Sequence, residues 1–274
     1  MIYTKTAEEI AKMRQGGKIL AGIMEKIKKE VRPGITTLEL DQFGDKLISQ
    51  VGEPSFKHVR DYKWATCLCV NEVVVHGIPN DYKLKDGDLL GIDIGMLYKG
   101  FNTDMAKTIK IESKKLPARN APATTSQMLA GAGGKVKNDN IDKFLDVGRE
   151  ALKRATEQAQ AGNRVGHISQ AIQQTIERAH FSVVPSLVGH GVGKVLHEPP
   201  QIPGVLREPI EQTPLLEEGM VIAIEVIYNQ GKPQVVYRNN DGWTIQTADG
   251  SLSGLFENTI AILKNGPEIL TITT

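Results

Sequence analysis

Apolar residues at helical spacing alternate along the chain with shorter apolar runs that are typical of strands. From Thr6 the segment AEEIAKMRQGGKILAGIMEKIKKEV keeps its apolar residues on one stripe, which predicts a helix ended by Pro33 and Gly34. A second helix is predicted to begin near Thr37, and after Pro54 the runs CLCVNEVVV and DLLGIDIGML favour strands. The stripe of the first helix consists of Ile10, Met13, Ile19, Leu20, Ile23, Met24 and Ile27.

The same order of helices and then strands returns in the second part of the chain. DKFLDVGREALKRATEQAQ favours a helix, Gly162 to Gly166 a break, HISQAIQQTIERAH another helix, and the sequence after Val183 short strands with turns. The segment KDGDLLGID at 85–93 also matches EEGMVIAIE at 217–225 in register, and each ends on an acid. We therefore expect an α+β chain of two related halves, roughly 1–111 and 142–274, that form a single domain over 1–274.

The stretch between the halves, 112–141, has few large apolar residues and no sustained period. We expect it to be a mobile surface insertion, because long connections inside a compact domain are usually functional or disordered. Its lysines suggest a transient contact with ribosomes, and the alternative is a solvated loop. These lysines are Lys114, Lys115, Lys135 and Lys137.

Composition narrows the class of protein. The 274 residues are 40% hydrophobic and 24% charged, as in an ordinary globular chain, and 33 basic against 32 acidic residues argue against a specific nucleic-acid or membrane partner. The N-terminal 20 residues carry charges throughout and lack the apolar core of a signal peptide, so we expect a cytoplasmic location. Cys67 and Cys69 share one face of a strand-like run, which favours reduced thiols in the core or a pocket over a disulfide.

Four carboxylates and one histidine lie in apolar or glycine-rich runs, where an unpaired charge is costly. A buried acid needs a cation or a tight partner, so this set indicates a dinuclear metal site. Asp93 and Asp104 are spaced for two antiparallel strands joined by a hairpin, which would turn both carboxylates toward one cavity. Mostly oxygen ligands with one imidazole suit Mn(II), Fe(II) or Co(II), with Zn(II) as a further candidate. The set is Asp93, Asp104, His190, Glu225 and Glu257.

Two further histidines stand beside turn residues. His197 follows His190 in GHGVGKVLHEPP, and His76 ends the strand-like VVVHGIP. A single histidine in such a context is as well explained by a hydrogen-bonded core residue as by a ligand.

Six motifs in one order give the chain a family resemblance. They are HGIP at 76, GIDIG with the NTD at 102, GHGVGKVLHEPP at 189, GMVIAIE at 219, DGWT at 241 and LFENTI at 255. In these the chain resembles the type I methionine aminopeptidases from KTAEEIAKMRQGGKILA to EILT, and only 112–141 lacks a counterpart of its length. The resemblance implies a pita-bread fold, with a curved antiparallel sheet inside, helices outside, and a single catalytic domain.

The resemblance also implies roles for the site residues. Asp93 would chelate one metal ion, Asp104 and Glu257 would bridge two, and His190 with Glu225 would complete the other site. Glu225 would also carry a proton, His197 would lie near the scissile carbonyl and His76 near the leaving nitrogen. Because metal ions lower the pKa of the water that they bind toward about 7, hydrolysis is the expected reaction.

The substrate implied is the N-terminal methionine of peptides and nascent chains, with a small second residue, and the enzyme is expected to be a monomer. An apolar pocket would take the methionine side chain, formed by Phe56, Tyr62, Cys67, Leu196 and Trp243. The chain departs from the family in having Val226 where proline is usual, Asn258 where histidine is usual, and Val59 where an aromatic residue is usual.

Two alternatives stay open. A proline-specific aminopeptidase or prolidase would share the five ligands, but its usual large N-terminal domain is not expected here, and HGIP and DGWT favour the methionine enzymes. A pita-bread binding module without catalysis would ordinarily lose metal ligands, and all five are present.

Overall fold

Helices and strands follow one another twice along the chain, as the hydrophobic pattern predicts. The computed structural model describes residues 2–113, 131–238 and 240–273, with the backbone alone for 131–139. The helices are α1 (Ala7–Glu30), α2 (Thr37–Ser49), α3 (Gly131–Gln158) and α4 (Val165–Arg178), with the 3-10 turns η1 (Ser55–His58) and η3 (Ile210–Gln212). The strands are β1 (Glu53–Pro54), β2 (Thr66–Val70), β3 (Val73–Val75), β4 (Leu89–Tyr98), β5 (Phe101–Lys110), β6 (Ser182–Val183), β7 (Val188–Gly191), β8 (Glu198–Pro203), β9 (Val221–Asn229), β10 (Val235–Tyr237), β11 (Ile245–Thr247), β12 (Ser253–Leu263) and β13 (Gly266–Ile269).

The first two helices begin where their sequences supply caps. Thr6 precedes α1 and Thr36 precedes α2, and each hydroxyl accepts a hydrogen bond from the backbone N–H three residues on. The glutamates at those positions, Glu9 and Glu39, accept hydrogen bonds from the capping residues' own N–H groups. Such capping boxes satisfy N–H groups that the helix itself leaves unpaired, and they fix both predicted helix starts.

A ten-stranded sheet carries strands from both halves in the order β1-β4-β5-β12-β9-β7-β8. β2 pairs with β4, β6 with β9 and β13 with β12, and all of these pairings are antiparallel. The halves join where β5 pairs with β12, so that a long hairpin of the first half lies beside two long strands of the second. A separate three-stranded sheet has the order β10-β11-β3.

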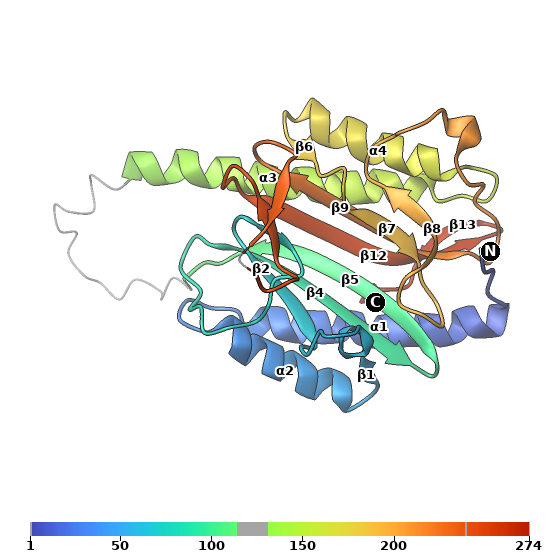
Figure 1. The fold of residues 1–274 in the computed structure, drawn as a ribbon, viewed down its shortest axis with the longest axis horizontal. Helices are drawn as coiled ribbons and strands as arrows, with labels where there is room; N and C mark the ends of the chain where they lie inside the picture. Colours follow the sequence, from blue (N-terminus) through green and yellow to red (C-terminus); the bar gives the residue numbers. More distant parts are fainter. Residues whose placement is uncertain (1, 114–130, 239, 274) are drawn as a thin grey trace.

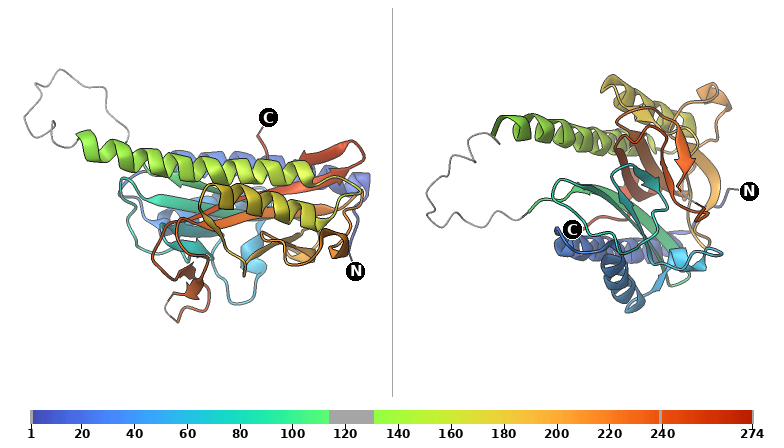
Figure 2. Two further views of the ribbon diagram at one scale, coloured as in Figure 1. Left: turned by 90° about the horizontal axis from the view of Figure 1, so that it is seen from above. Right: turned by 60° about the vertical axis from the view of Figure 1, so that its left-hand side comes forward.

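The four helices lie on one face of the large sheet (Figure 1). α1 and α2 cover the N-terminal strands, and α3 and α4 cover the C-terminal strands, each pair over its own hydrophobic cluster. The view from above shows the β10–β11 hairpin projecting on the side away from α3 (Figure 2). The sheet thus has one face packed by helices and one that the loops and the small sheet enclose, as the α+β prediction requires.

Two expectations about the elements need correction. Residues 131–141 belong to α3, which begins at Gly131 rather than after 141. The structure describes only the backbone of residues 131–139. Their sequence, rich in Ala, Gly, Lys and Asn, has no apolar period that would predict a helix. The strands after Val183 are not all short, since β9 has 9 residues and β12 has 11. The expected mobility of 114–130 lies outside the described residues.

Within the described part of the chain, no helix combines the length and the apolar character needed to cross a membrane. The two cysteines are free thiols, and both are buried, as expected.

Replacing Gly17 by alanine should destabilise the protein, whereas the same change at Gly22 in the same helix should not. A Cβ at Gly17 would lie 2.4 Å from the Leu270 carbonyl oxygen, and at Gly22 it would meet nothing within 4 Å. We expect Gly17→Ala to lower the free energy of unfolding by about 1–3 kcal/mol through overpacking. Gly22→Ala should raise it by up to about 1 kcal/mol through helix propensity. Urea unfolding followed by circular dichroism measures both, and equal effects of the two changes would contradict this packing.

Candidate active site

Three of the predicted metal-binding acids lie in one row across the sheet. Asp93 on β4 faces Ala106 on β5, Ala106 faces Glu257 on β12, and Glu257 faces Glu225 on β9. Directly opposed residues of neighbouring strands point to the same face, so these carboxylates share the face away from the helices. Ala106, which lies between Asp93 and Glu257, contributes only a methyl group to this row.

The other two predicted ligands extend this row. Asp104 lies two residues before Ala106 on the same strand, and His190 on β7 faces Ala223, two residues before Glu225. Each therefore points to the same face. Ligand atoms of Asp104, His190 and Glu257 lie within 4.8 Å of one another, and His190 Nε2 lies 3.4 Å from Glu225 Oε1.

Backbone contacts fix the orientation of two of these groups. The Asp104 carboxylate accepts a hydrogen bond from the Met105 N–H, while the Thr259 hydroxyl accepts from the Asp104 N–H and donates to its carbonyl. His190 Nδ1 lies 2.8 Å from the Gly191 carbonyl oxygen, which assigns the proton to Nδ1 and leaves Nε2 free as a ligand.

Burial and mutual repulsion make the ionised form of the acids costly. Burial raises the pKa of Asp104 to about 7, and burial with the Asp104 charge raises the pKa of Glu225 to about 8. Burial, followed by the neighbouring carboxylates, holds the pKa of Asp93 and of Glu257 well above the usual range. Burial and His197 together lower the pKa of His190 to about 4, so its ring is neutral at pH 7.

The residues present fit a divalent cation. Asp93 Oδ1 and Glu257 Oε1 are buried oxygens with no hydrogen-bond partner among the described residues, and both belong to the cluster. Buried polar atoms are otherwise nearly always paired, so these oxygens mark positions that a positive charge would satisfy. A neutral imidazole and clustered carboxylates are the donor set that divalent ions take in proteins.

The cluster opens into a small cavity of about 130 Å³. Every site residue predicted from the sequence lines it, the metal-binding set together with His76, His197 and the pocket residues Phe56, Tyr62, Cys67, Leu196 and Trp243. Burial lowers the pKa of His76 and of His197, and the rings of His190 and His197 stand edge to face with centroids 4.4 Å apart. The cavity therefore holds acids and neutral histidines at one end and apolar side chains at the other.

Aromatic side chains build the apolar end. Tyr62 contacts Phe56, Trp64 and Trp243 edge to face, and Trp243 in turn contacts His76. The Tyr62 hydroxyl lies 2.9 Å from the Thr66 carbonyl oxygen and 3.2 Å from Cys67 Sγ. Burial, followed by the Asp93 charge, keeps the pKa of Cys67 high. Cys67 is therefore a neutral thiol in the cavity wall, as expected.

Three lining residues were not predicted as part of the site. Val75 and Leu255 form walls of the cavity, and Val59 stands where the family usually has an aromatic side chain. Leu255 could have been found from its sequence position, because it lies two residues before Glu257 on one strand and so shares its face. Val75 directly precedes His76, and only its place at the end of β3 turns it toward the cavity.

Known proteins are similar to this chain in sequence and in fold. The sequence profile of metallopeptidase family M24 matches residues 11–262. A methionine aminopeptidase of Clostridium perfringens is 40% identical over 99% of each chain. The crystal structure of a methionine aminopeptidase from Thermotoga maritima is 37% identical and covers 99% of each chain with a TM-score of 0.85.

This chain belongs to the methionine aminopeptidases of metallopeptidase family M24. The pita-bread fold expected from the sequence is confirmed. A prolidase from Pyrococcus horikoshii has the same fold, with a TM-score of 0.72 at 23% identity, and the chain covers 64% of its length. The methionine aminopeptidases are thus similar in both sequence and fold, and the prolidase in fold.

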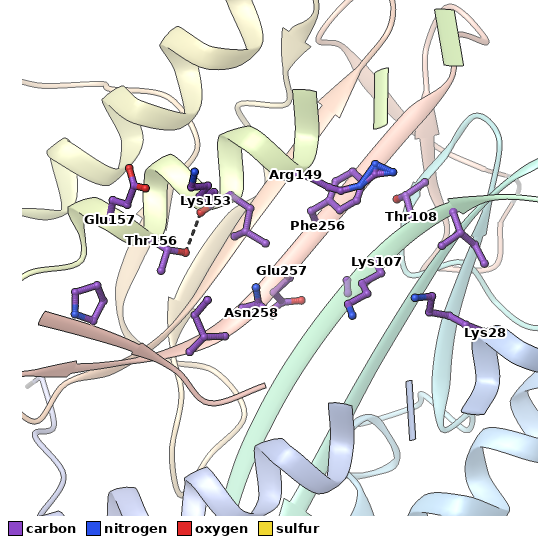
Figure 3. Close-up of a pocket in the computed structure, with 15 residues that line it drawn as sticks. Lys28, Lys107, Thr108, Arg149, Lys153, Thr156, Glu157, Phe256, Glu257 and Asn258 are labelled. Atoms are coloured by element: carbon purple, nitrogen blue, oxygen red, sulfur yellow. Dashed lines mark hydrogen bonds between the residues drawn. The ribbon is translucent and has the colours of Figure 1, made fainter. Parts of the chain in front are cut away.

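Two departures from the methionine aminopeptidase pattern lie on the helix side of the sheet. Val226 is buried in the cluster under α3 and α4. Asn258 lines a groove of about 640 Å³ between α1, α3 and the strands β5 and β12 (Figure 3). Its Oδ1 accepts a hydrogen bond from Thr271. Neither side chain is part of the cavity wall, so neither substitution changes the set of acids.

The groove itself differs in chemistry from the cavity. Lys28 and Lys107 both pair with Glu25, and Arg149 lies over the Phe256 ring at 5.9 Å (Figure 3). Lys28, Lys107 and Arg149 are held by neighbouring groups, whereas no lysine or arginine among the described residues pairs with the acids on the opposite face. The converging acids and the neutral histidines therefore line the smaller cavity and not the groove's cationic side.

The metal-free protein should lose stability as the pH rises from about 4 to about 8. Folding raises the pKa of Asp104 from 3.8 to about 7 and that of Glu225 from 4.5 to about 8. The folded state then holds more protons in this window, so their contribution is complete below the unfolded values and is lost as the pH passes the folded ones. Chelator-treated protein unfolded in urea at a series of pH values measures this slope.

The matched control is the Asp104→Asn/Glu225→Gln variant, whose slope should be shallower, and divalent metal at pH 8 should restabilise only the wild type. Identical pH profiles for the two proteins would show that these acids do not titrate as their burial implies.

Proposed function

We propose that this chain removes the N-terminal methionine from peptides and nascent proteins by metal-dependent hydrolysis, with a preference for a small second residue. The observation that carries the proposal is a row of buried acids that ends beside a small apolar cavity. A cavity of about 130 Å³ accommodates one side chain rather than a stretch of polypeptide, which suits an exopeptidase. The relatives named methionine aminopeptidase match over nearly the whole chain.

The cofactor in this proposal is a pair of divalent ions, Mn(II), Fe(II) or Co(II), with Zn(II) as a further candidate. The residues that would hold these ions are Asp93 at one site, His190 with Glu225 at the other, and Asp104 with Glu257 between the two sites. The oxygens of Asp93 and Glu257 that lack partners, and the row that joins both to Glu225, support this assignment. When bound, the ions supply an activated water and polarise the scissile carbonyl.

The chain's own residues then handle protons and charge. Glu225 would accept the proton of the attacking water and return it to the leaving amine, a role that its place in the cavity wall beside His190 allows. Neutral His197 donates a hydrogen bond to the carbonyl oxygen as negative charge develops there. Neutral His76 lies beside Trp243 and acts at the peptide nitrogen.

The apolar end of the cavity binds the methionine side chain. Phe56, Tyr62, Cys67, Leu196 and Trp243 give it an aromatic and thioether-compatible surface, since sulfur packs favourably against ring edges. Val59 leaves this end less aromatic than is usual in the family.

The wider setting of the enzyme also belongs to this proposal. The protein acts as a cytoplasmic monomer and meets its substrates as nascent chains emerge. The ribosome contact suggested by Lys114, Lys115, Lys135 and Lys137 stays a prediction, because those side chains lie outside the described residues.

Purified protein should release methionine from Met-Ala-Ser only with a divalent metal, and should cleave Xaa-Pro peptides at least about tenfold more slowly. Glu225→Ala should lower kcat by at least about a hundredfold, since proton transfer by a placed acid typically contributes that much. The control is Glu217→Ala, which changes an exposed acid at the start of the segment 217–225 that ends on Glu225. Its kcat should match that of the wild type.

Methionine release is measured by chromatography after metal reconstitution with Mn(II), Fe(II) or Co(II). Folded protein that is silent with all three metals would overturn the proposed reaction. Faster cleavage of Xaa-Pro peptides would favour the proline-specific enzymes, and metal binding without either cleavage would favour a binding module.

Trp243→Ala should raise KM for Met-Ala-Ser with little change in kcat. The indole packs on Tyr62 and forms the cavity wall, and losing such an apolar contact costs about 1.5–3 kcal/mol of binding. KM should therefore rise about tenfold to a hundredfold. Tyr237→Ala, at a side chain that is 67% exposed on the nearby hairpin, should leave KM unchanged. A Trp243→Ala variant with wild-type KM would exclude the indole from the methionine pocket.

A further inference from the structure

The turn between β7 and β8, residues 192–197, brings two cavity residues into place. Leu196 lines the apolar end and His197 stands against His190 with ring centroids 4.4 Å apart. A turn of this kind has few regular hydrogen bonds of its own, so the position of His197 depends on what holds the turn from outside.

A buried ion pair lies directly after this turn. Glu198 follows His197, and its Oε2 lies 2.7 Å from Lys5 Nζ, with side chains that are only 9% and 4% exposed. Figure 1 shows the N-terminal segment entering at the end of the sheet where β8 and β13 lie. Lys5 is anchored there because its N–H donates to the Gly219 carbonyl and its ammonium also donates to the Tyr3 carbonyl.

The turn packs tightly on the pair. The other carboxylate oxygen of Glu198 accepts a hydrogen bond from the Val195 N–H at 3.2 Å. A Cβ on Gly193 would lie 2.6 Å from that oxygen and 2.6 Å from Lys5 Cε, so the Gly193 backbone rests against both partners. The ion pair therefore contacts the turn at Gly193 and Val195, and Glu198 is itself bonded to His197.

A second set of hydrogen bonds holds the first part of the turn. Asn102 Nδ2 donates to the carbonyls of Gly193 and Lys194, and Asn102 Oδ1 accepts from Ser55, the neighbour of the pocket residue Phe56. These hydrogen bonds restrain residues 193–194, whereas the ion pair holds Val195 and also Glu198, the residue bonded to His197.

We infer that Lys5 and Glu198 are positioning residues that hold His197 at the cavity through the β7–β8 turn. The inference rests on the proposed function, because it assigns these residues an effect on the step in which His197 takes part. Neither residue lines the cavity, so they act through the turn and not on the substrate. A buried pair is also a device of specificity rather than of net stability, since desolvation offsets its attraction.

The test compares kcat for Met-Ala-Ser in four proteins: wild type, His197→Ala, Lys5→Met/Glu198→Gln, and the combination of all three changes. The double change removes both charges, so no unpaired charge is left buried. We expect it to lower kcat about tenfold to a hundredfold, the usual effect of a displaced catalytic group, while metal content by mass spectrometry is unchanged. In the His197→Ala background the same change should lower kcat by less than about twofold, because the group that it displaces is gone.

The matched control is Lys194→Met, which removes a lysine of the same turn that is 66% exposed and lies 3.9 Å from Glu9. It should leave kcat unchanged. Equal losses with and without His197 would make the pair merely structural and overturn the inference, as would wild-type kcat in the double variant or loss of metal from it. Lys5→Met alone is a second variant, with the same expectation. Absence of methionine release by wild type would instead overturn the proposed function.

Discussion

Burial of several carboxylates on one face of a sheet is the constraint on which the rest of this structure depends. Asp93, Glu257 and Glu225 lie in one row across four strands, with Ala106 between Asp93 and Glu257. Asp104 and His190 join this row within a few ångströms. Like charges at this separation in a poorly solvated cavity cannot all ionise without compensation. A bound cation supplies that compensation, and in its absence protons do, which is why the pKa values of these acids rise.

The two-halved architecture explains how one row can collect acids from such distant parts of the sequence. Each half contributes a long strand that ends its apolar run on an acid, Asp93 on β4 and Glu225 on β9. The junction of β5 and β12 then sets these strands in register, with Ala106 opposite both Asp93 and Glu257. A shift of one residue at this junction would turn Glu257 toward the helices, so the site forms only in this pairing register.

The acids of the site could be predicted from the sequence because their surroundings contradict their charge. Asp93 follows Leu-Leu-Gly-Ile, and Glu225 follows Val-Ile-Ala-Ile. In such apolar runs an ionised carboxylate without a partner is energetically costly. The helices α1, α2 and α4 could be predicted from their apolar period. The start of α3 could not, because residues 131–141 lack that period, and the length of β12 could not, because Glu257 and Asn258 interrupt its apolar run.

Other parts of the site depend on contacts that no local pattern encodes. The placement of Ala106 in the row follows from pairing with two strands, one of them about 150 positions away in sequence. The Lys5–Glu198 pair joins residues 193 positions apart, and neither has a neighbour that marks it as buried. The outward direction of Val226 and Asn258, which leaves the acids untouched, follows from strand alternation once the register is known.

The location of bound metal in the protein shows whether these five side chains form a two-metal site. Crystals grown with Mn(II) and measured near the manganese absorption edge would show its position by anomalous scattering. We expect two anomalous peaks among Asp93, Asp104, His190, Glu225 and Glu257. Manganese bound at full occupancy elsewhere in the protein, with no anomalous peak between these five side chains, would rule out a metal site there.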